Sequence, residues 1–271
     1  MTLQDALNLG AAAIGRHEAK FLLSHATGLS PDKLILYANK PLDEPAKGAF
    51  FAGLERRKAK EPLQYILGRW EFMGLEVITD TRALIPRPET ELLVEKALEH
   101  IQNLNRPAKV LDVCTGSGCI AVAIAKLSGA EVTALDISPA ALSLAAENAN
   151  LNNVTLNLVQ SDLFQSLEKQ TYDIIISNPP YIPTSELTTL QPEITNHEPI
   201  LALDGGPDGL DLYRRLIPES LKHLSPNGAI FLEIGPSEAK GIMTQAGYDI
   251  VHLIKDYAGK DRILIGIWKG K

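Results

Sequence analysis

The sequence of 271 residues is poor in cysteine and in metal-binding patterns. Its two cysteines, Cys114 and Cys119, form no CxxC pair and have no histidine neighbours, which argues against a disulfide framework and against a zinc site. The six histidines show no ligand spacing, so we expect no metal. A reducing cytoplasm is the expected compartment.

Long apolar runs are also lacking. The longest run, residues 119–125, is far shorter than the roughly 20 residues that cross a bilayer. The first ten residues lack the basic stretch that begins a secretion signal. We therefore expect a cytoplasmic protein that does not contact a membrane.

Basic residues are fewer than acidic ones, 26 against 33, which gives a formal net charge of −7. Residues 1–79 contain ten basic and nine acidic residues, so the excess of acid lies in the remainder of the chain. A protein that binds duplex nucleic acid through phosphates needs a clustered excess of Lys and Arg. We expect no stable binding of nucleic acid.

The chain is long enough for one full-size domain and a small one. Apolar residues in 1–68 recur at spacings of three and four and are interrupted by glycine and proline, which predicts a small helical bundle. Residues 69–80 alternate loosely around Met73 and Gly74 and are expected to form a hairpin linker. Residues 81–271 form the larger domain.

Apolar strands alternate with helical stretches from Lys109 onward, which predicts an α/β fold with a mostly parallel sheet covered on both faces. Ligands bind such sheets at the carboxyl ends of the strands. The stretch 182–207 is irregular and long enough to be functional. The expected strands are 109–113, 131–136, 155–160, 173–178, 228–234, 248–254 and 262–268, and the expected helices follow Gly118 and cover 138–150, 208–224 and 237–246.

Polar residues follow the first three of these strands. The first strand ends at Asp112 and leads into a glycine turn, residues 114–118, whose backbone N–H groups can approach a ligand closely. Asp136 closes the second strand, at the distance where an acid accepts both ribose hydroxyls. After the third strand, Asp162 can accept an adenine amine and Leu163 can pack on the ring. Together these strand ends predict an adenosine site.

Two alternatives remain for this region. The acids can instead cap helices, and residues 116–121 also satisfy the GxGxxA pattern of an NAD-binding domain. Asp112 argues against NAD, because a carboxylate before the turn would crowd a pyrophosphate. The same carboxylate can orient the amino and carboxyl groups of a methionine, which favours S-adenosylmethionine.

The fourth strand leads into Asn178-Pro179-Pro180-Tyr181. The two prolines fix the backbone and remove two donors, which leaves a turn rich in acceptors. The Asn178 side-chain oxygen and the Pro179 carbonyl can each accept one N–H of an amide or aromatic amine and orient its lone pair. Tyr181 is expected to stack on this planar group. No metal or strong base is needed; the alternative is a plain turn with a core tyrosine.

These four residues, after the turn D-V-C-T-G-S-G, resemble the amino-methyltransferases of the S-adenosylmethionine-dependent Rossmann-like class. Three more segments narrow the resemblance: Ile85–Glu91 (IPRPETE), His197–Leu210 (HEPILALDGGPDGL) and Asp256–Arg262 (DYAGKDR). With the helical N-terminal part, they resemble the HemK/PrmC family along essentially the whole chain.

The resemblance implies a protein-(glutamine-N5) methyltransferase that acts on the Gly-Gly-Gln motif of class 1 peptide chain release factors. It implies S-adenosyl-L-methionine as cofactor, S-adenosyl-L-homocysteine as product, and docking of the release factor on residues 1–68; we expect a monomer. The basic residues of 55–60 otherwise form a solvated helix face. The expected catalytic residues are Asn178, Pro179 and Tyr181; the expected substrate-binding residues are Asn178, Pro179, Pro180 and Tyr181; the expected cofactor-binding residues are Cys114, Thr115, Gly116, Ser117, Gly118, Asp136, Asp162, Leu163 and Asn178.

One departure from the family pattern is Cys114, where the family usually has glycine. We therefore expect the backbone there to avoid conformations that only glycine tolerates. Both Cys114 and Cys119 are expected to be small buried residues and not nucleophiles.

Two other functions fit parts of the pattern. A DNA adenine or RNA guanine amino-methyltransferase shares the Asn-Pro-Pro-Tyr motif, but such an enzyme must flip a base and hold the nucleic acid, and the chain offers no basic recognition domain. A non-catalytic nucleotide-binding module would leave the acceptor-rich turn at 178–181 unexplained.

Overall fold

The computed structural model describes residues 1–167, 169–235 and 237–270. It divides into two units, each with its own core. The first unit comprises Met1–Arg69 and Gln191–His197, and the second comprises Trp70–Leu190 and Glu198–Lys271. The chain therefore passes between the two units three times.

The first unit is the helical bundle expected from the sequence. Thr2 begins it with a capping box, and Gly28 ends its second helix in the left-handed conformation that glycine favours. Leucines from each of its first five helices are buried, and so is Phe50. The helices are α1 (Leu3–Ile14), α2 (Arg16–Thr27), α3 (Pro31–Leu36), α4 (Glu44–Lys58) and α5 (Leu63–Leu67).

A short helix from far along the chain, α9 (Pro192–Thr195), also belongs to this unit. Arg57 on α4 donates to Glu18 at 2.7 Å and to Glu193 of α9 at 3.1 Å. The Arg57 side chain is only 15% exposed, so at this position the expectation of a solvated basic face is wrong. Arg57 instead ties α9 to the bundle.

The hairpin expected at 69–80 is present. Strand β1 (Arg69–Phe72) pairs with β2 (Leu75–Ile78), and both turn residues, Met73 and Gly74, have positive φ. Two consecutive residues of positive φ make the type of tight turn that suits the twist of a hairpin.

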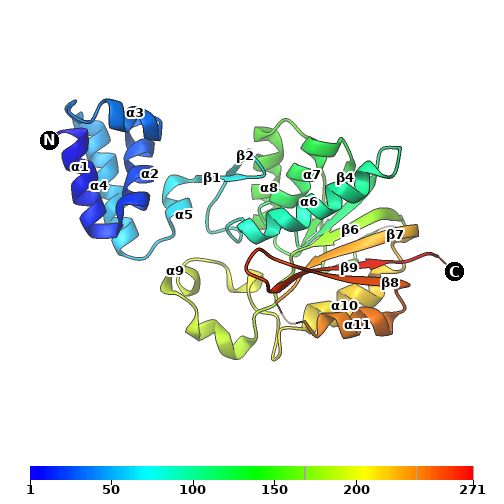
Figure 1. Cartoon of the computed structure of the whole chain (residues 1–271). Helices are drawn as coiled ribbons and strands as arrows, with labels where there is room; N and C mark the ends of the chain where they lie inside the picture. Colours follow the sequence, from blue (N-terminus) through cyan, green and yellow to red (C-terminus); the bar gives the residue numbers. More distant parts are fainter. Residues whose placement is uncertain (168, 236, 271) are drawn as a thin grey trace. The chain divides into compact units, whose positions relative to one another are not determined.

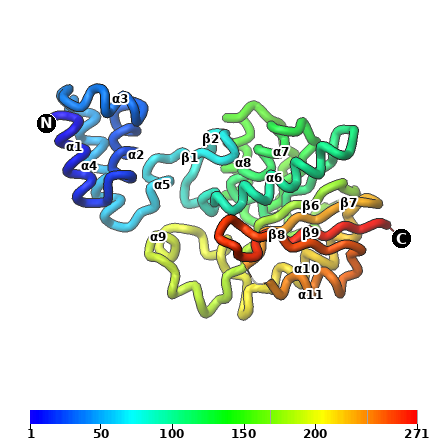
Figure 2. Tube along the Cα trace, in the orientation of Figure 1, coloured from blue at the N-terminus to red at the C-terminus, as the bar shows by residue number. Residues whose placement is uncertain are grey.

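The second unit has a seven-stranded sheet in the order β5-β4-β3-β6-β7-β9-β8. The strands from β5 to β7 are parallel, and β9 runs antiparallel between β7 and β8, as the red and orange tubes of Figure 2 show. The expected α/β fold is confirmed. The strands are β3 (Lys109–Val113), β4 (Glu131–Asp136), β5 (Asn157–Gln160), β6 (Tyr172–Ser177), β7 (Leu224–Glu233), β8 (Ile250–Lys255) and β9 (Asp261–Ile267).

Helices cover both faces of this sheet (Figure 1). On one face lie α6 (Pro88–Gln102), α7 (Cys119–Ser128) and α8 (Pro139–Leu151), and on the other lie α10 (Asp211–Ser220) and α11 (Ala239–Ala246). Alternate strand residues serve the two cores: Val110 faces one and Leu111 the other. This alternation is the period of two that a strand imposes on its side chains. Among the described residues, no helix has the length and apolar character needed to cross a bilayer.

The register of the parallel strands fixes where the site lies. Val113 is paired with Leu135 of β4 and with Ser177 of β6, and Ser177 is paired with Leu232 of β7. The loops after these four strands therefore open at one edge. The stretch 182–207, expected to be irregular, contains only short turns of helix: η1 (Thr184–Thr189), α9 and η2 (Ile200–Ala202).

Candidate functional site

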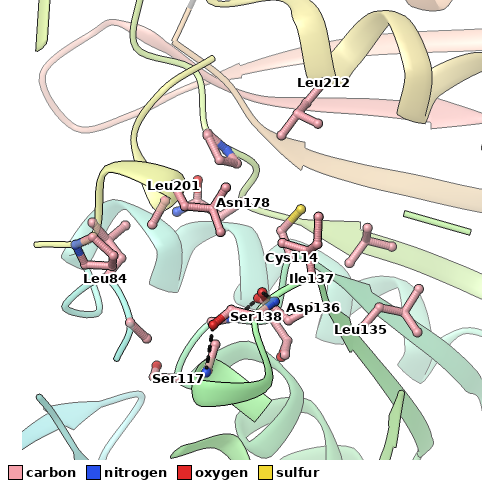
Figure 3. Close-up of a pocket in the computed structure, with 18 of the residues that line it drawn as sticks. Leu84, Cys114, Ser117, Leu135, Asp136, Ile137, Ser138, Asn178, Leu201 and Leu212 are labelled. Atoms are coloured by element: carbon pink, nitrogen blue, oxygen red, sulfur yellow. Dashed lines mark hydrogen bonds between the residues drawn. The ribbon is translucent and has the colours of Figure 1, made fainter. Parts of the chain in front are cut away.

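A cavity of about 450 Å³ opens at the carboxyl edge of the sheet in the second unit (Figure 3). Two of the segments that resemble the family contribute to its wall, 85–91 and 197–210, together with the strand ends. Of the residues predicted from sequence, those that line the cavity are Cys114, Thr115, Gly116, Ser117, Asp136, Asp162, Leu163, Asn178 and Pro180.

Gly118, Pro179 and Tyr181 do not line this cavity. A Cβ at Gly118 would lie 2.7 Å from the Ala145 Cβ, so Gly118 allows α7 to begin close against α8. Pro179 is buried in the turn. The Tyr181 ring lies over Gly235, where a Cβ would come within 2.4 Å of it. Direct contacts of these three residues with substrate or cofactor remain predictions.

Asp136 is fixed at the cavity by backbone groups. Its two carboxylate oxygens accept from Gly116 N at 2.8 Å and from Ser138 N at 2.9 Å. Burial raises the pKa of Asp136, and these N–H groups act against that shift. Each oxygen keeps a further acceptor site. A rigid carboxylate with spare acceptors fits the two hydroxyls of a ribose.

The neighbouring strand end presents Asp162 and Leu163. Arg215 of α10 also lines the cavity and donates to the Asp162 carboxylate at 2.7 Å. The sequence analysis missed Arg215, because it comes from a helix 53 positions later. The ion pair orients a carboxylate that is expected to meet the adenine amine.

The backbone at Cys114 has φ +61°, within the left-handed region that favours glycine. The expectation that Cys114 avoids this region is therefore wrong: the turn keeps the glycine-like conformation and the cysteine tolerates it, at roughly 1–2 kcal/mol. A backbone hydrogen bond stabilises this turn, because Thr115 N donates to Leu135 O at 2.8 Å. Leu163 also has positive φ, +51°. Strained residues of this kind gather at functional sites.

The two thiols are free. Cys119 is buried, and Cys114 is half-buried against the core beneath α10. Burial raises the pKa of both thiols, that of Cys119 to about 12. A thiol that stays protonated is a poor nucleophile. The expectation of a buried side chain is confirmed for Cys119 but is wrong for Cys114, which is half-buried and lines the cavity.

Asp112 lies behind the glycine turn and outside the cavity lining. Its carboxylate accepts from the Thr115 hydroxyl at 2.6 Å, and burial raises the pKa of Asp112 to about 7. The sequence suggested that Asp112 contacts the methionine part directly, and this expectation is wrong. Asp112 instead holds Thr115, which does line the cavity.

The other side of the cavity presents Asn178. Its side-chain nitrogen donates to the Thr90 hydroxyl at 3.1 Å, and that hydroxyl donates to the Glu233 carboxylate at 2.6 Å. The Tyr181 hydroxyl lies 3.4 Å from the other oxygen of Glu233. Sequence reasoning missed Thr90 and Glu233. The rule that found Asp136, a polar residue at a strand end, would have found Glu233 as well.

An ion pair joins the two segments of the cavity wall. Arg87 donates to Glu198 at 2.6 Å, and the Glu198 side chain is only 2% exposed. The backbone N–H of Ile85 lies 3.4 Å from the same carboxylate. The pair links two segments more than a hundred positions apart. Among the described residues, no group of His, Cys, Asp and Glu side chains is arranged to hold a metal.

Two family models match the chain: the PrmC N-terminal domain over residues 5–68 and the methyltransferase small domain over residues 89–205. The release factor glutamine methyltransferase of Geobacter sulfurreducens is 45% identical, and the alignment covers 93% of this chain and 89% of that protein. The protein of the same name from Thermodesulfovibrio yellowstonii is 41% identical, with coverage of 92% and 91%.

Among solved structures, a methyltransferase from Pyrococcus furiosus has a similar fold. The TM-score is 0.55 at 22% identity, and the match covers 74% of this chain and 91% of that one. This similarity supports the assignment of the fold.

Proposed function

The chain belongs to the release factor glutamine methyltransferase family, and we propose that it methylates the glutamine side chain of the Gly-Gly-Gln motif in class 1 peptide chain release factors. The methyl donor is S-adenosylmethionine, the target is the amide nitrogen N5, and the second product is S-adenosylhomocysteine. One observation supports this most directly: Asn178 lies on the same cavity as Asp136 and the glycine turn.

The residues of the cavity suit the cofactor. Asp136, Asp162, Leu163 and the turn at 114–117 all line this one cavity. Asp136 is proposed to bind the ribose, Asp162 and Leu163 the adenine, and the turn the methionine part. When bound, S-adenosylmethionine would supply a methyl group on a positively charged sulfur. Asp136 contributes a carboxylate to a cavity that receives a cation, which favours that charge, whereas Asp162 is already paired with Arg215.

The acceptor nitrogen needs orientation more than activation by a base. The Asn178 side-chain oxygen accepts one N–H of the glutamine amide and directs its lone pair, and the Pro179 carbonyl is proposed to accept the second. The nitrogen forms a new C–N bond while the C–S bond breaks and leaves its electron pair on sulfur. The positively charged nitrogen then loses one proton to water. Both acceptors bind more strongly as that charge develops.

Tyr181 is not suited to take this proton. Burial, with the nearby charge of Glu233, raises the pKa of Tyr181 to about 12. Its hydroxyl therefore stays protonated and acts as a donor toward Glu233. We propose that Tyr181 contributes through its ring and not as a base.

We further propose that the helical unit, residues 1–68, docks the release factor. Ile35 and Leu36 of α3 are 65% and 74% exposed, which leaves apolar surface on this unit for a partner. The enzyme is proposed to act in the cytoplasm as a monomer, without stable binding to nucleic acid or membranes.

A transfer assay with labelled S-adenosylmethionine tests the function. The acceptors are an unmodified release factor, the same factor with the motif glutamine replaced by asparagine, and unmodified DNA and RNA. Mass spectrometry is expected to find one methyl group on the glutamine and none on the variant or the nucleic acids. Label on adenine or guanine amines would support the nucleic-acid alternative, and no transfer to any acceptor would support a non-catalytic module.

A further inference from the structure

Three side chains at the acceptor side form a hydrogen-bonded series: Asn178, Thr90 and Glu233. We propose that Thr90 and Glu233 are positioning residues that fix which end of the Asn178 amide faces the substrate. This inference rests on the proposed function, because it concerns how Asn178 receives the glutamine amide.

The direction of each hydrogen bond follows from the chemistry of the groups. An ionised carboxylate only accepts, so the single proton of the Thr90 hydroxyl is directed to Glu233. The Thr90 oxygen is then left to accept, and only the nitrogen end of Asn178 can donate to it. The oxygen end of Asn178 must therefore be the one available to the substrate. The opposite orientation would place an amide donor against the donor N–H of glutamine.

Burial makes this direction strict. Thr90 is 2% exposed and Glu233 is 1% exposed, so little water reaches the series to supply other partners. A buried polar group that loses its partner costs about 1–3 kcal/mol. The arrangement with every donor matched to an acceptor is thus strongly preferred over a reversed one.

The series works only while Glu233 is ionised, and the groups around it act in both directions. Burial raises the pKa of Glu233, and the carboxylate of Glu89 on α6 adds to that effect. The hydroxyls of Thr90 and Tyr181 and the positive charge of Arg262 on β9 lower it. Glu233 thus depends on Arg262 and on two hydroxyl donors to hold its charge.

Arg262 is itself held in place by the segment 256–262. Its guanidinium lies 3.3 Å from the Asp256 carboxylate and 3.4 Å from the Ile234 carbonyl. This segment does not line the cavity. The segment 256–262 therefore acts on the site indirectly: its Arg262 supplies the positive charge that keeps Glu233 ionised.

The fold explains how distant segments meet here. Asn178 and Glu233 lie at the carboxyl ends of the neighbouring strands β6 and β7, where Ser177 is paired with Leu232. Thr90 lies in the first turn of α6, which packs on the same sheet. Thr90 thus bridges two strand ends.

The first test replaces Thr90 by valine, which keeps the shape and removes the hydroxyl. We expect kcat to fall about 10- to 100-fold with the dissociation constant of S-adenosylmethionine within about threefold, since only the acceptor side is disturbed. Thr90→Ser keeps the hydroxyl and is expected to retain at least about a third of the activity. Thr133→Val is the matched control, because Thr133 is 4% exposed in β4 and outside the cavity. Near-normal kcat in Thr90→Val overturns the inference.

A second readout does not depend on activity. Protein labelled with ¹⁵N in asparagine side chains gives an Asn178 amide signal that Asn178→Asp identifies by its loss. We expect one proton of this amide to exchange slowly in the wild type and rapidly in Thr90→Val, with no change in Thr133→Val. If the wild-type signal exchanges freely, Thr90 does not hold Asn178. The exchange measurement tests the contact between Thr90 and Asn178 even if the release factor proves not to be the substrate.

The third test is pH. Protonated Glu233 can donate to Thr90, which frees the hydroxyl to turn toward the oxygen end of Asn178, so wild-type kcat is expected to fall as the pH drops through the pKa of Glu233. Glu233→Gln should lack this acidic limb at whatever activity it retains. Its melting temperature should equal or exceed that of the wild type at neutral pH, because a buried charge is removed. An unchanged pH profile in Glu233→Gln would show that Glu233 does not control the step.

Discussion

The two sides of the cavity are constructed differently. On the cofactor side, Asp136 is held by two backbone N–H groups within its own and the preceding loop. On the acceptor side, Asn178 is held by side chains that come from α6 and β7. The two oxygens of a carboxylate are equivalent, so the backbone donors only have to fix the position of Asp136. The two ends of the Asn178 amide differ, so the Thr90 hydroxyl also selects which end faces the cavity. The first side is suited to binding and the second to orienting a reacting group.

This difference predicts two classes of variant, and the largest effect is expected for Asn178→Ala. Loss of one preorganised partner of the transition state costs about 10²–10³ in rate, so kcat should fall by that factor. The dissociation constant of S-adenosylmethionine, measured by calorimetry, should change far less. Asn178→Asp keeps an acceptor and should fall between alanine and wild type. Normal single-turnover methylation by Asn178→Ala would show that residues 178–181 form a turn without a role in orienting the substrate.

Asp136→Ala is expected to show the reverse pattern. A hydrogen bond to a charged group contributes about 1.5–3 kcal/mol, so the affinity for S-adenosylmethionine should fall by about one to two decades. At saturating cofactor, kcat should stay close to that of the wild type. Calorimetry and initial rates check both values. A fall in kcat with unchanged affinity for S-adenosylmethionine would contradict the assignment of binding to one side of the cavity and orientation to the other.

Tyr181→Phe should have a mild effect. The hydroxyl lies at 3.4 Å from Glu233, a long contact, while the ring fills the space over Gly235. We expect kcat within about threefold of the wild type, measured with saturating release factor and cofactor. A loss comparable with that of Asn178→Ala would mean that the hydroxyl carries a proton in the reaction.

Cys114→Gly is expected to have the smallest effect. Glycine removes the left-handed strain at this position but loses the contacts of the thiol and gains entropy in the unfolded chain. These contributions oppose one another, so the free energy of unfolding should change by less than about 1 kcal/mol. Chemical denaturation measures it. A large loss of stability would show that the thiol contacts dominate the local energy.

The sequence predicted the cofactor side better than the acceptor side, and the reason is physical. Asp136 and the glycine turn are encoded within one strand-turn-helix unit, where spacing determines position. Thr90 and Glu233 meet Asn178 only because β7 lies beside β6 and α6 packs on that sheet, and strand order is not visible in local spacing. The positive φ of Cys114 was also missed, because the turn imposes it against the preference of the residue.

The helix α9 has a consequence for the synthesis of the protein. The first 69 residues include all of α1 to α5, yet their bundle also contains Gln191–His197, and Glu193 pairs with Arg57 across 136 positions. At roughly 5–20 residues per second, the ribosome makes the intervening stretch of about 120 residues in some 6–24 s. The bundle emerges first but completes its contacts only after β3 to β6 have followed it. The first unit therefore reaches its full set of contacts only after a large part of the second unit has been synthesised.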